Sequence, residues 1–185
     1  MSRSSLQDRL VACVGCFDIE GVMREVAAFM NCPVDAVLPL HSTGDHWVTD
    51  SAHGFQMRLH HPHAKWGPHN LKADRWGLAE LVIWLHADTN MAAWTFALPL
   101  GMRADMQAGE LKAHLNAMDV QCKEEMIGGS KRFVQNHFLA NAQMVQCEWR
   151  WTGTAWRMAQ LKFGHLGTLR PRCDEHEPPT VQDGW

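Results

Sequence analysis

The sequence predicts an α+β fold in which two helix-then-antiparallel-strands units form one sheet that helices cover on one face. Some segments repeat apolar residues every three or four positions, as helices packed on a core do, whereas others alternate apolar and polar residues, as half-buried strands do. The order of helix followed by strands occurs twice, over residues 18–98 and again over residues 105–165. We therefore expect helices on one side of the sheet and an open face on the other.

The first predicted elements are helices. Ser5 and Asp8 have the spacing of a capping box, and the helix that they start is expected to end at Gly15. Asp18 is the expected cap of a second helix, in which an apolar stripe at helical spacing ends before an asparagine and a proline. Residues 33–38 are expected to add one short helical turn.

The rest of the first unit is predicted to be strands and loops. Residues 46–50 and 55–60 form a predicted hairpin, because apolar and polar residues alternate after a turn-forming segment. A long loop over residues 61–76 follows, rich in proline, glycine and histidine. Residues 78–86 are apolar on both faces, which is typical of a central strand, and residues 94–98 are predicted to form the strand after it.

The second unit is predicted to be a helix followed by a meander. Asp105 is the expected cap, and an apolar stripe continues from it to Asn116. The apolar residues of the last strand change phase midway, which predicts a bulge at Ala159 and Gln160. The three predicted strands of the meander are residues 131–140, 143–151 and 154–163.

Composition and charge restrict the class of protein. The chain has 185 residues, of which 46% are hydrophobic and 20% charged, as in globular proteins. We expect one unit of helices and antiparallel strands over residues 1–99 and a second unit, a helix and a meander, over residues 100–170. An acidic, disordered tail is expected over residues 171–185. Outside that tail the charges balance, so we expect no nucleic-acid partner. No apolar run reaches the length of a membrane helix and no secretion signal is present, so we expect a cytoplasmic protein without a membrane partner and with reduced cysteines.

No residue pattern in the chain predicts catalysis. A thiol or hydroxyl nucleophile would need a local signature such as G-x-S-x-G, and none is present. Cys13 and Cys16 have metal-ligand spacing but lack a second pair, so buried packing explains them better. Four histidines lie close together in the loop: His60, His61, His63 and His69. We interpret them as a polar loop, expect no metal, cofactor or catalytic residue, and keep a metal-dependent hydrolase as an alternative.

The tryptophans and arginines near strand ends are the candidate binding residues. A large ring with one N–H donor at a strand end is typical of an interface anchor. If the partner presents a basic cleft, the acids Asp45, Asp50, Asp74 and Glu148 become the better candidates. The residues that we expect to contact a partner are Asp45, His46, Trp47, Glu148, Arg150, Trp151, Trp156 and Arg157.

One stretch of the chain, residues 51–115, resembles a known group of proteins. It contains SAHGFQMRL, LAELVIWL, FALPLGM and ELKAHL in that order. This pattern resembles the immunity proteins of bacterial polymorphic and type VI secretion toxin systems, in which a Gly-containing strand, a second strand and a Leu-Pro-x-Gly turn precede a short helix. Their fold is similar to that of the small outer-membrane assembly lipoprotein and of the tandem-repeat β-lactamase inhibitory protein.

The resemblance implies a function without chemistry. It implies a cytoplasmic protein that binds the cognate toxin effector of its own cell and neutralises it by occluding the toxin's active site. Two alternatives stay open beside it. One is a secretion chaperone or adaptor for an effector, and the other is the metal-dependent hydrolase that would use the His60–His69 loop.

Overall fold

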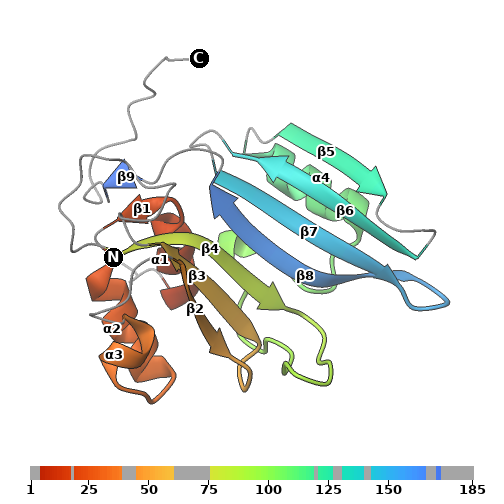
Figure 1. The fold of residues 1–185 in the computed structure, drawn as a ribbon. Coiled ribbons are helices and arrows are strands. Elements are labelled where there is room, and N and C mark those ends of the chain that lie inside the picture. The colour runs from red at the N-terminus through yellow and green to blue at the C-terminus, as the bar shows by residue number, and fades with distance from the viewer. Residues whose placement is uncertain are drawn as a thin grey trace.

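The structure is a computed structural model that describes residues 5–17, 19–38, 45–60, 76–118, 131–139 and 143–165, and the backbone of residues 121–126 and 170–171. It has the α+β class that the sequence predicts (Figure 1). The elements are α1 Leu6–Cys13, β1 Cys16–Phe17, α2 Glu20–Phe29, α3 Val34–Val37, β2 Asp45–Asp50, β3 Phe55–His60, β4 Gly77–Trp84, the 3-10 turn η1 Pro99–Gly101, α4 Ala108–Asn116, β5 Gln121–Met126, β6 Arg132–Phe138, β7 Gln143–Trp151, β8 Trp156–His165 and β9 Arg170–Pro171.

The main sheet has the strand order β2-β3-β4-β8-β7-β6-β5, and every neighbouring pair in it is antiparallel. The two predicted units meet where their last strands pair, from Glu80 opposite Gly164 to Trp84 opposite Gln160. The short strand β1 pairs with β4 and, in parallel, with β9. One hydrophobic core contains side chains from both units, so the two units pack as one body.

The two faces of the sheet differ in what covers them. Val145, Cys147 and Trp149 alternate on β7 and are buried in the core that the helices share. The intervening residues, such as Gln146 and Arg150, point to the opposite face, which is turned toward the viewer in Figure 1 while α4 lies behind the sheet. Helices therefore cover one face, as predicted.

The helix starts agree only partly with the predicted caps. The Ser5 hydroxyl accepts the N–H of Asp8 at 3.2 Å, which confirms the first cap. Helix α2 begins after Ile19, and the predicted cap Asp18 lies outside the described residues. The cap of α4 is Gln107 instead of Asp105, because Gln107 forms a capping box with Glu110, whose carboxylate accepts the Gln107 N–H at 2.7 Å.

The strand predictions were right for the first hairpin and for the bulge. Glu148 pairs with Gln160 and Trp149 pairs with Met158, so Ala159 is the extra residue. The strand predicted over residues 94–98 does not form. Strand β4 already has β3 on one side and β8 on the other, so no free edge remains beside it. Strand β5 was missed, because its sequence QCKEEM has no clear alternation of apolar and polar residues.

Two buried amide side chains connect helices to the sheet. The Nε2 atom of Gln143 donates to the carbonyl oxygens of Val11 at 3.0 Å and Val14 at 2.8 Å. The indole N–H of Trp149 donates to Gln135 Oε1 at 3.0 Å, and Gln135 Nε2 in turn donates to the carbonyl of Ala108. The helix layer is thus held by specific hydrogen bonds in addition to apolar packing.

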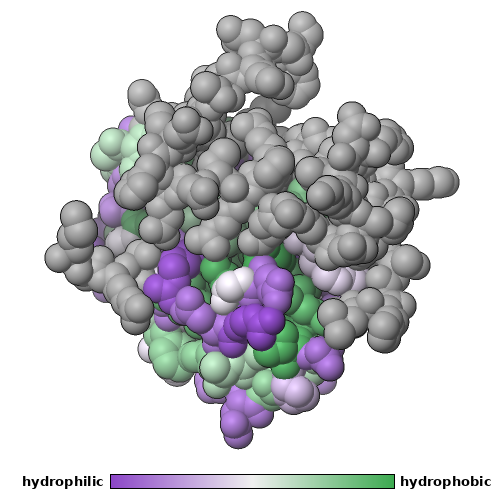
Figure 2. All heavy atoms as spheres, turned by 90° about the vertical axis from the view of Figure 1, so that its left-hand side faces the viewer, coloured by the Kyte–Doolittle hydropathy of each residue, from purple (hydrophilic) through white to green (hydrophobic). Residues whose placement is uncertain are grey.

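The outer side of the N-terminal helices is mixed in polarity. Figure 2 shows hydrophilic and hydrophobic residues side by side on this side of the molecule. Glu20, Arg24 and Glu25 on α2 are exposed, whereas Val22, Met23 and Val26 are buried. None of the helices in the described ranges has the length and apolar content that a membrane span requires.

Candidate binding site at the β7–β8 hairpin tip

Most of the predicted contact residues lie at one end of the sheet, where β7 turns into β8. Arg150, Trp151, Trp156 and Arg157 belong to the hairpin tip, which we define as residues 150–157, and Glu148 lies next to it. Strand β4 pairs with β8 only from Gln160 to Gly164. The tip therefore extends beyond β4, and Figure 1 shows it projecting from the body of the protein.

The turn at the tip is held by its own hydrogen bonds. Thr152 donates from both its N–H and its hydroxyl to the carbonyl of Ala155, each at 2.9 Å. The same hydroxyl accepts the N–H of Ala155 at 3.3 Å, and Gly153 supplies a φ of 99°. The N–H of Trp151 donates to the carbonyl of Lys131, the residue just before β6, at 2.9 Å. The backbone that carries the candidate residues is thus ordered before any partner binds.

An aromatic series on the helix-side face of the sheet leads from the core to the tip. Trp149 is fully buried, with a relative exposure of 0%, and its ring stacks on Phe133 at 5.8 Å. Phe133 contacts Trp156 edge-on at 4.8 Å, and Trp156 lies 5.6 Å from Trp151. Trp151 is 38% exposed. The outermost ring is therefore available to a partner while the rings behind it fix its position.

The opposite face of the same strands carries three arginines in one row. Arg132 lies directly opposite Arg150, and Arg150 lies directly opposite Arg157. Glu148, which is 5% exposed, accepts from Arg132 at 2.5 Å and from Arg150 at 2.8 Å. Among the described residues no carboxylate lies within ion-pair distance of Arg157. We call Arg132, Arg150 and Arg157 the arginine row.

The remaining predicted residues lie on the edge strand β2. The Asp45 carboxylate is 2.6 Å from Nδ1 of His60 and 3.5 Å from the Arg58 guanidinium. The same guanidinium lies 5.8 Å from the ring centroid of Trp47, which is 47% exposed. His46 points to the other face of the sheet, where its ring is 6.1 Å from that of Trp76.

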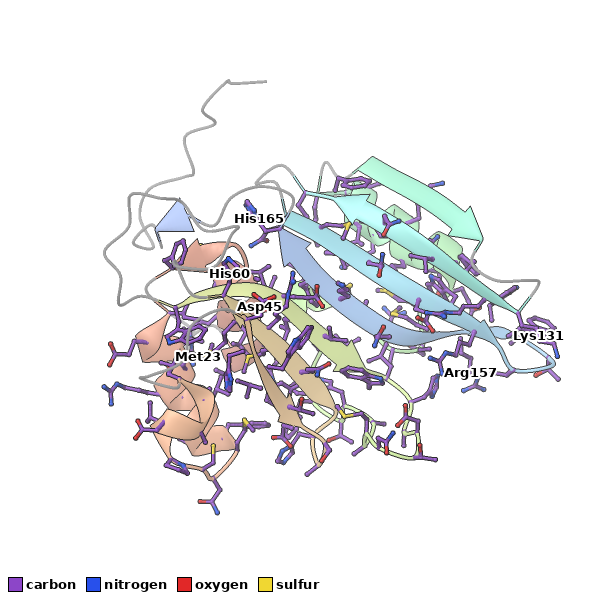
Figure 3. All side chains as sticks on the ribbon, in the orientation of Figure 1. Met23, Asp45, His60, Lys131, Arg157 and His165 are labelled. Atoms are coloured by element: carbon purple, nitrogen blue, oxygen red, sulfur yellow. The ribbon has the colours of Figure 1, made fainter. Side chains whose placement is uncertain are left out.

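These two groups of residues form separate surfaces. Trp47 lies in the same row as Gly164, three strands away, and seven residues along β8 separate Gly164 from Arg157. With strands 4.8 Å apart and a rise of 3.3 Å per residue, the two groups are about 27 Å apart. Figure 3 shows the same separation, with Asp45 and His60 together near one end and Lys131 and Arg157 at the other. A small epitope would include only one group.

The acids that a basic cleft would contact are already paired within the chain. Asp50 is buried and accepts the N–H of His53 at 3.0 Å, with the ring of His53 2.7 Å away. Asp45 and Glu148 are paired as above, and Asp74 lies outside the described residues. The charge that the described part of the tip leaves unpaired is positive.

The predicted histidine loop lies almost wholly outside the described residues, which include His60 but not His61, His63 or His69. Within the described ranges no three potential ligands are grouped as a metal site would need. Cys13 is buried in the core, in agreement with the packing interpretation, and Cys16 is half-buried.

Sequence reasoning missed the residues that β6 adds to the site. Arg132 extends the arginine row and Phe133 joins two of the tryptophans. The signal was the meander itself, because an antiparallel register between β6 and β7 places Arg132 beside Arg150. In comparisons with known proteins, no family model matches the chain, and no curated protein or solved structure matches it either.

Proposed function

We propose that the chain is an immunity protein that binds a cognate antibacterial toxin in the cytoplasm and neutralises it by occluding the toxin's active site. The observation that supports this proposal is the hairpin tip, which projects, is internally braced and exposes Trp151 beside unpaired cationic charge. A rigid tip loses little conformational freedom on binding, so more of its contact energy contributes to affinity.

The tip also has the composition of an interface centre. Tryptophan and arginine are the side chains that most often dominate binding energy, especially when surrounding contacts exclude water. Trp151 and Trp156 lie on one side of the hairpin, and Arg150 and Arg157 lie on the other. A cleft that receives the tip would contact both sides at once, which suits a plug better than a flat contact does.

The proposal predicts that a gene beside this one encodes a large polypeptide with a C-terminal toxin domain, and that domain is the partner used in the test. Coexpression of the chain should restore growth to cells that produce this domain, and the purified proteins should form a complex measurable by calorimetry. Trp151→Ala and Trp156→Ala should each weaken the complex by about 2 kcal/mol, or roughly thirtyfold.

Trp47→Ala is the matched control, because Trp47 is even more exposed than Trp151 but lies at the other end of the sheet. It should leave the affinity unchanged. The absence of both a complex and growth protection would overturn the proposed function. Binding that depends on Trp47 and not on Trp151 would move the interface to β2.

A further inference from the structure

The arginine row is an arrangement that lowers the stability of the sheet. Like charges directly opposite each other on neighbouring strands are destabilising, and the row contains two such pairs in succession. Lys131, which is exposed, precedes Arg132 and adds a fourth cationic residue at this end of the sheet. Local rules of this kind are most often broken at functional sites.

Glu148 does not satisfy the whole row. Its two oxygens bind one nitrogen each, Nη2 of Arg132 and Nε of Arg150. The terminal nitrogens of Arg150 and the complete guanidinium of Arg157 have no hydrogen-bond acceptor among the described residues. A guanidinium has a planar set of donors that matches a carboxylate in a bidentate manner.

Among the described residues, Asp88 is the other acid near the tip, and it does not fill this position. Its Oδ1 accepts the N–H groups of Asn90 at 2.8 Å and Met91 at 2.9 Å. These two hydrogen bonds hold the pKa of Asp88 below its ordinary value, and the charge of Arg150 adds only a smaller effect. Asp88 is exposed and forms no ion pair with Arg150.

We infer that Arg150 and Arg157 bind an aspartate or glutamate side chain of the toxin, and that the cleft of the toxin that receives the hairpin tip is acidic. This inference rests on the proposed function and specifies its partner. It also argues against a toxin that acts on nucleic acid, because the basic cleft that binds a phosphate backbone would repel this tip.

The extent of the positive surface favours an acidic protein over a nucleic acid. A single-stranded nucleic acid needs a cationic path that follows its backbone over several nucleotides. Along the open face the next cation on β8, Lys162, is bound to Glu80 at 2.7 Å, and Arg58 follows between Glu80 and Asp45. Among the described residues of the open face, the unpaired positive charge is therefore confined to the tip, as expected of a contact with one or two carboxylates.

Charge reversal at Arg157 tests the inference. Arg157→Glu should bind the same toxin domain at least about tenfold more weakly than the wild-type chain, and its affinity should depend less on salt. It should fold at least as stably as the wild type, because it replaces a repulsive pair with Arg150 by an attractive one. Arg157→Lys, which keeps the charge but loses the planar fork, should have an intermediate affinity.

Arg24→Glu is the control, since Arg24 is an exposed arginine on α2 and should leave the affinity unchanged. Wild-type affinity in Arg157→Glu, with Trp151→Ala still weakened, would overturn the inference and leave the proposed function standing. A fluorescent 20-nucleotide single-stranded DNA or RNA is a second probe, used beside the toxin domain. Micromolar binding of that probe, lost in Arg157→Glu, would assign the row to nucleic acid and overturn the inference as well.

Discussion

Replacing Gln143 by leucine is expected to destabilise the protein by about 2 kcal/mol. The Gln143 side chain is 7% exposed, and its Nε2 atom donates to the carbonyls of Val11 and Val14 at the end of α1. Val11 keeps a partner in the variant, because its carbonyl also accepts the N–H of Val14. The Val14 carbonyl has no other described donor, and a buried unsatisfied carbonyl costs about 1 to 3 kcal/mol. Leucine has a similar volume, so a cavity adds little.

Urea unfolding followed by tryptophan fluorescence and far-ultraviolet circular dichroism measures this difference. The midpoint should fall with an unchanged slope, and the melting temperature should decrease by about 4 to 8 °C for a chain of this size. Gln160→Leu is the control, because Gln160 lies on the open face of β8 and makes no side-chain hydrogen bond within the described ranges. Equal unfolding free energies for the two variants would refute this account of Gln143.

Two further predictions concern the backbone and the response to acid. Gly54→Ala should be at least about 2 kcal/mol more destabilising than Gly153→Ala, because both have positive φ but only at Gly54 would the new Cβ lie 2.2 Å from a carbonyl oxygen, that of Ala92. Equal unfolding free energies would contradict this. Asp88→Ala should be less stable than the wild type at neutral pH, where the carboxylate is charged in both the folded and the unfolded chain. Since the pKa of Asp88 is lowered in the folded state, the difference in stability between the wild type and Asp88→Ala should vanish as the pH falls through the folded pKa. An equal difference between their urea midpoints at pH 7 and at about pH 2 would contradict this prediction.

The parts of the fold that the sequence predicts are those fixed by local patterns. Alternation from Phe55 to Leu59 identifies a half-buried strand, and the structure buries those apolar residues against the helices. The bulge at Ala159 is equally local, because an extra residue is the simplest way to bring Trp156 and Phe163 to the same face. Both features depend on side-chain direction within one strand.

The parts that were missed depend on what lies beside a segment. Residues 94–98 alternate like a strand, but β3 and β8 already occupy both edges of β4, so the segment stays irregular. Its backbone N–H at Trp94 reaches the end of β4, where it donates to the Trp84 carbonyl at 2.7 Å. Strand β5 is the opposite case: its apolar and polar residues alternate only weakly, but it forms because the edge of β6 is free to pair with it. The propensity of a segment is therefore overridden by the edges that the sheet offers.

The same distinction holds for the candidate site. The residue types near the tip follow from the sequence, because tryptophan and arginine at strand ends are visible in it, but their grouping requires the strand order. The strand order places two strands between β2 and β8, and the register adds seven residues along β8 between the row of Trp47 and Arg157. The register alone keeps the two groups about 23 Å apart and leaves the tip as a separate site.

Glu148 shows how stability and binding are connected at this site. The Glu148 carboxylate is only 5% exposed, and Arg132 and Arg150 bind it from both sides, which offsets the cost of its burial. In return, it removes part of the repulsion within the arginine row and fixes the direction of Arg150. Both of its oxygens bind arginines of the row, so its effect on a partner is indirect. At one end of the row, the Arg157 guanidinium has no acceptor among the described residues, and a partner's carboxylate would supply that acceptor on binding.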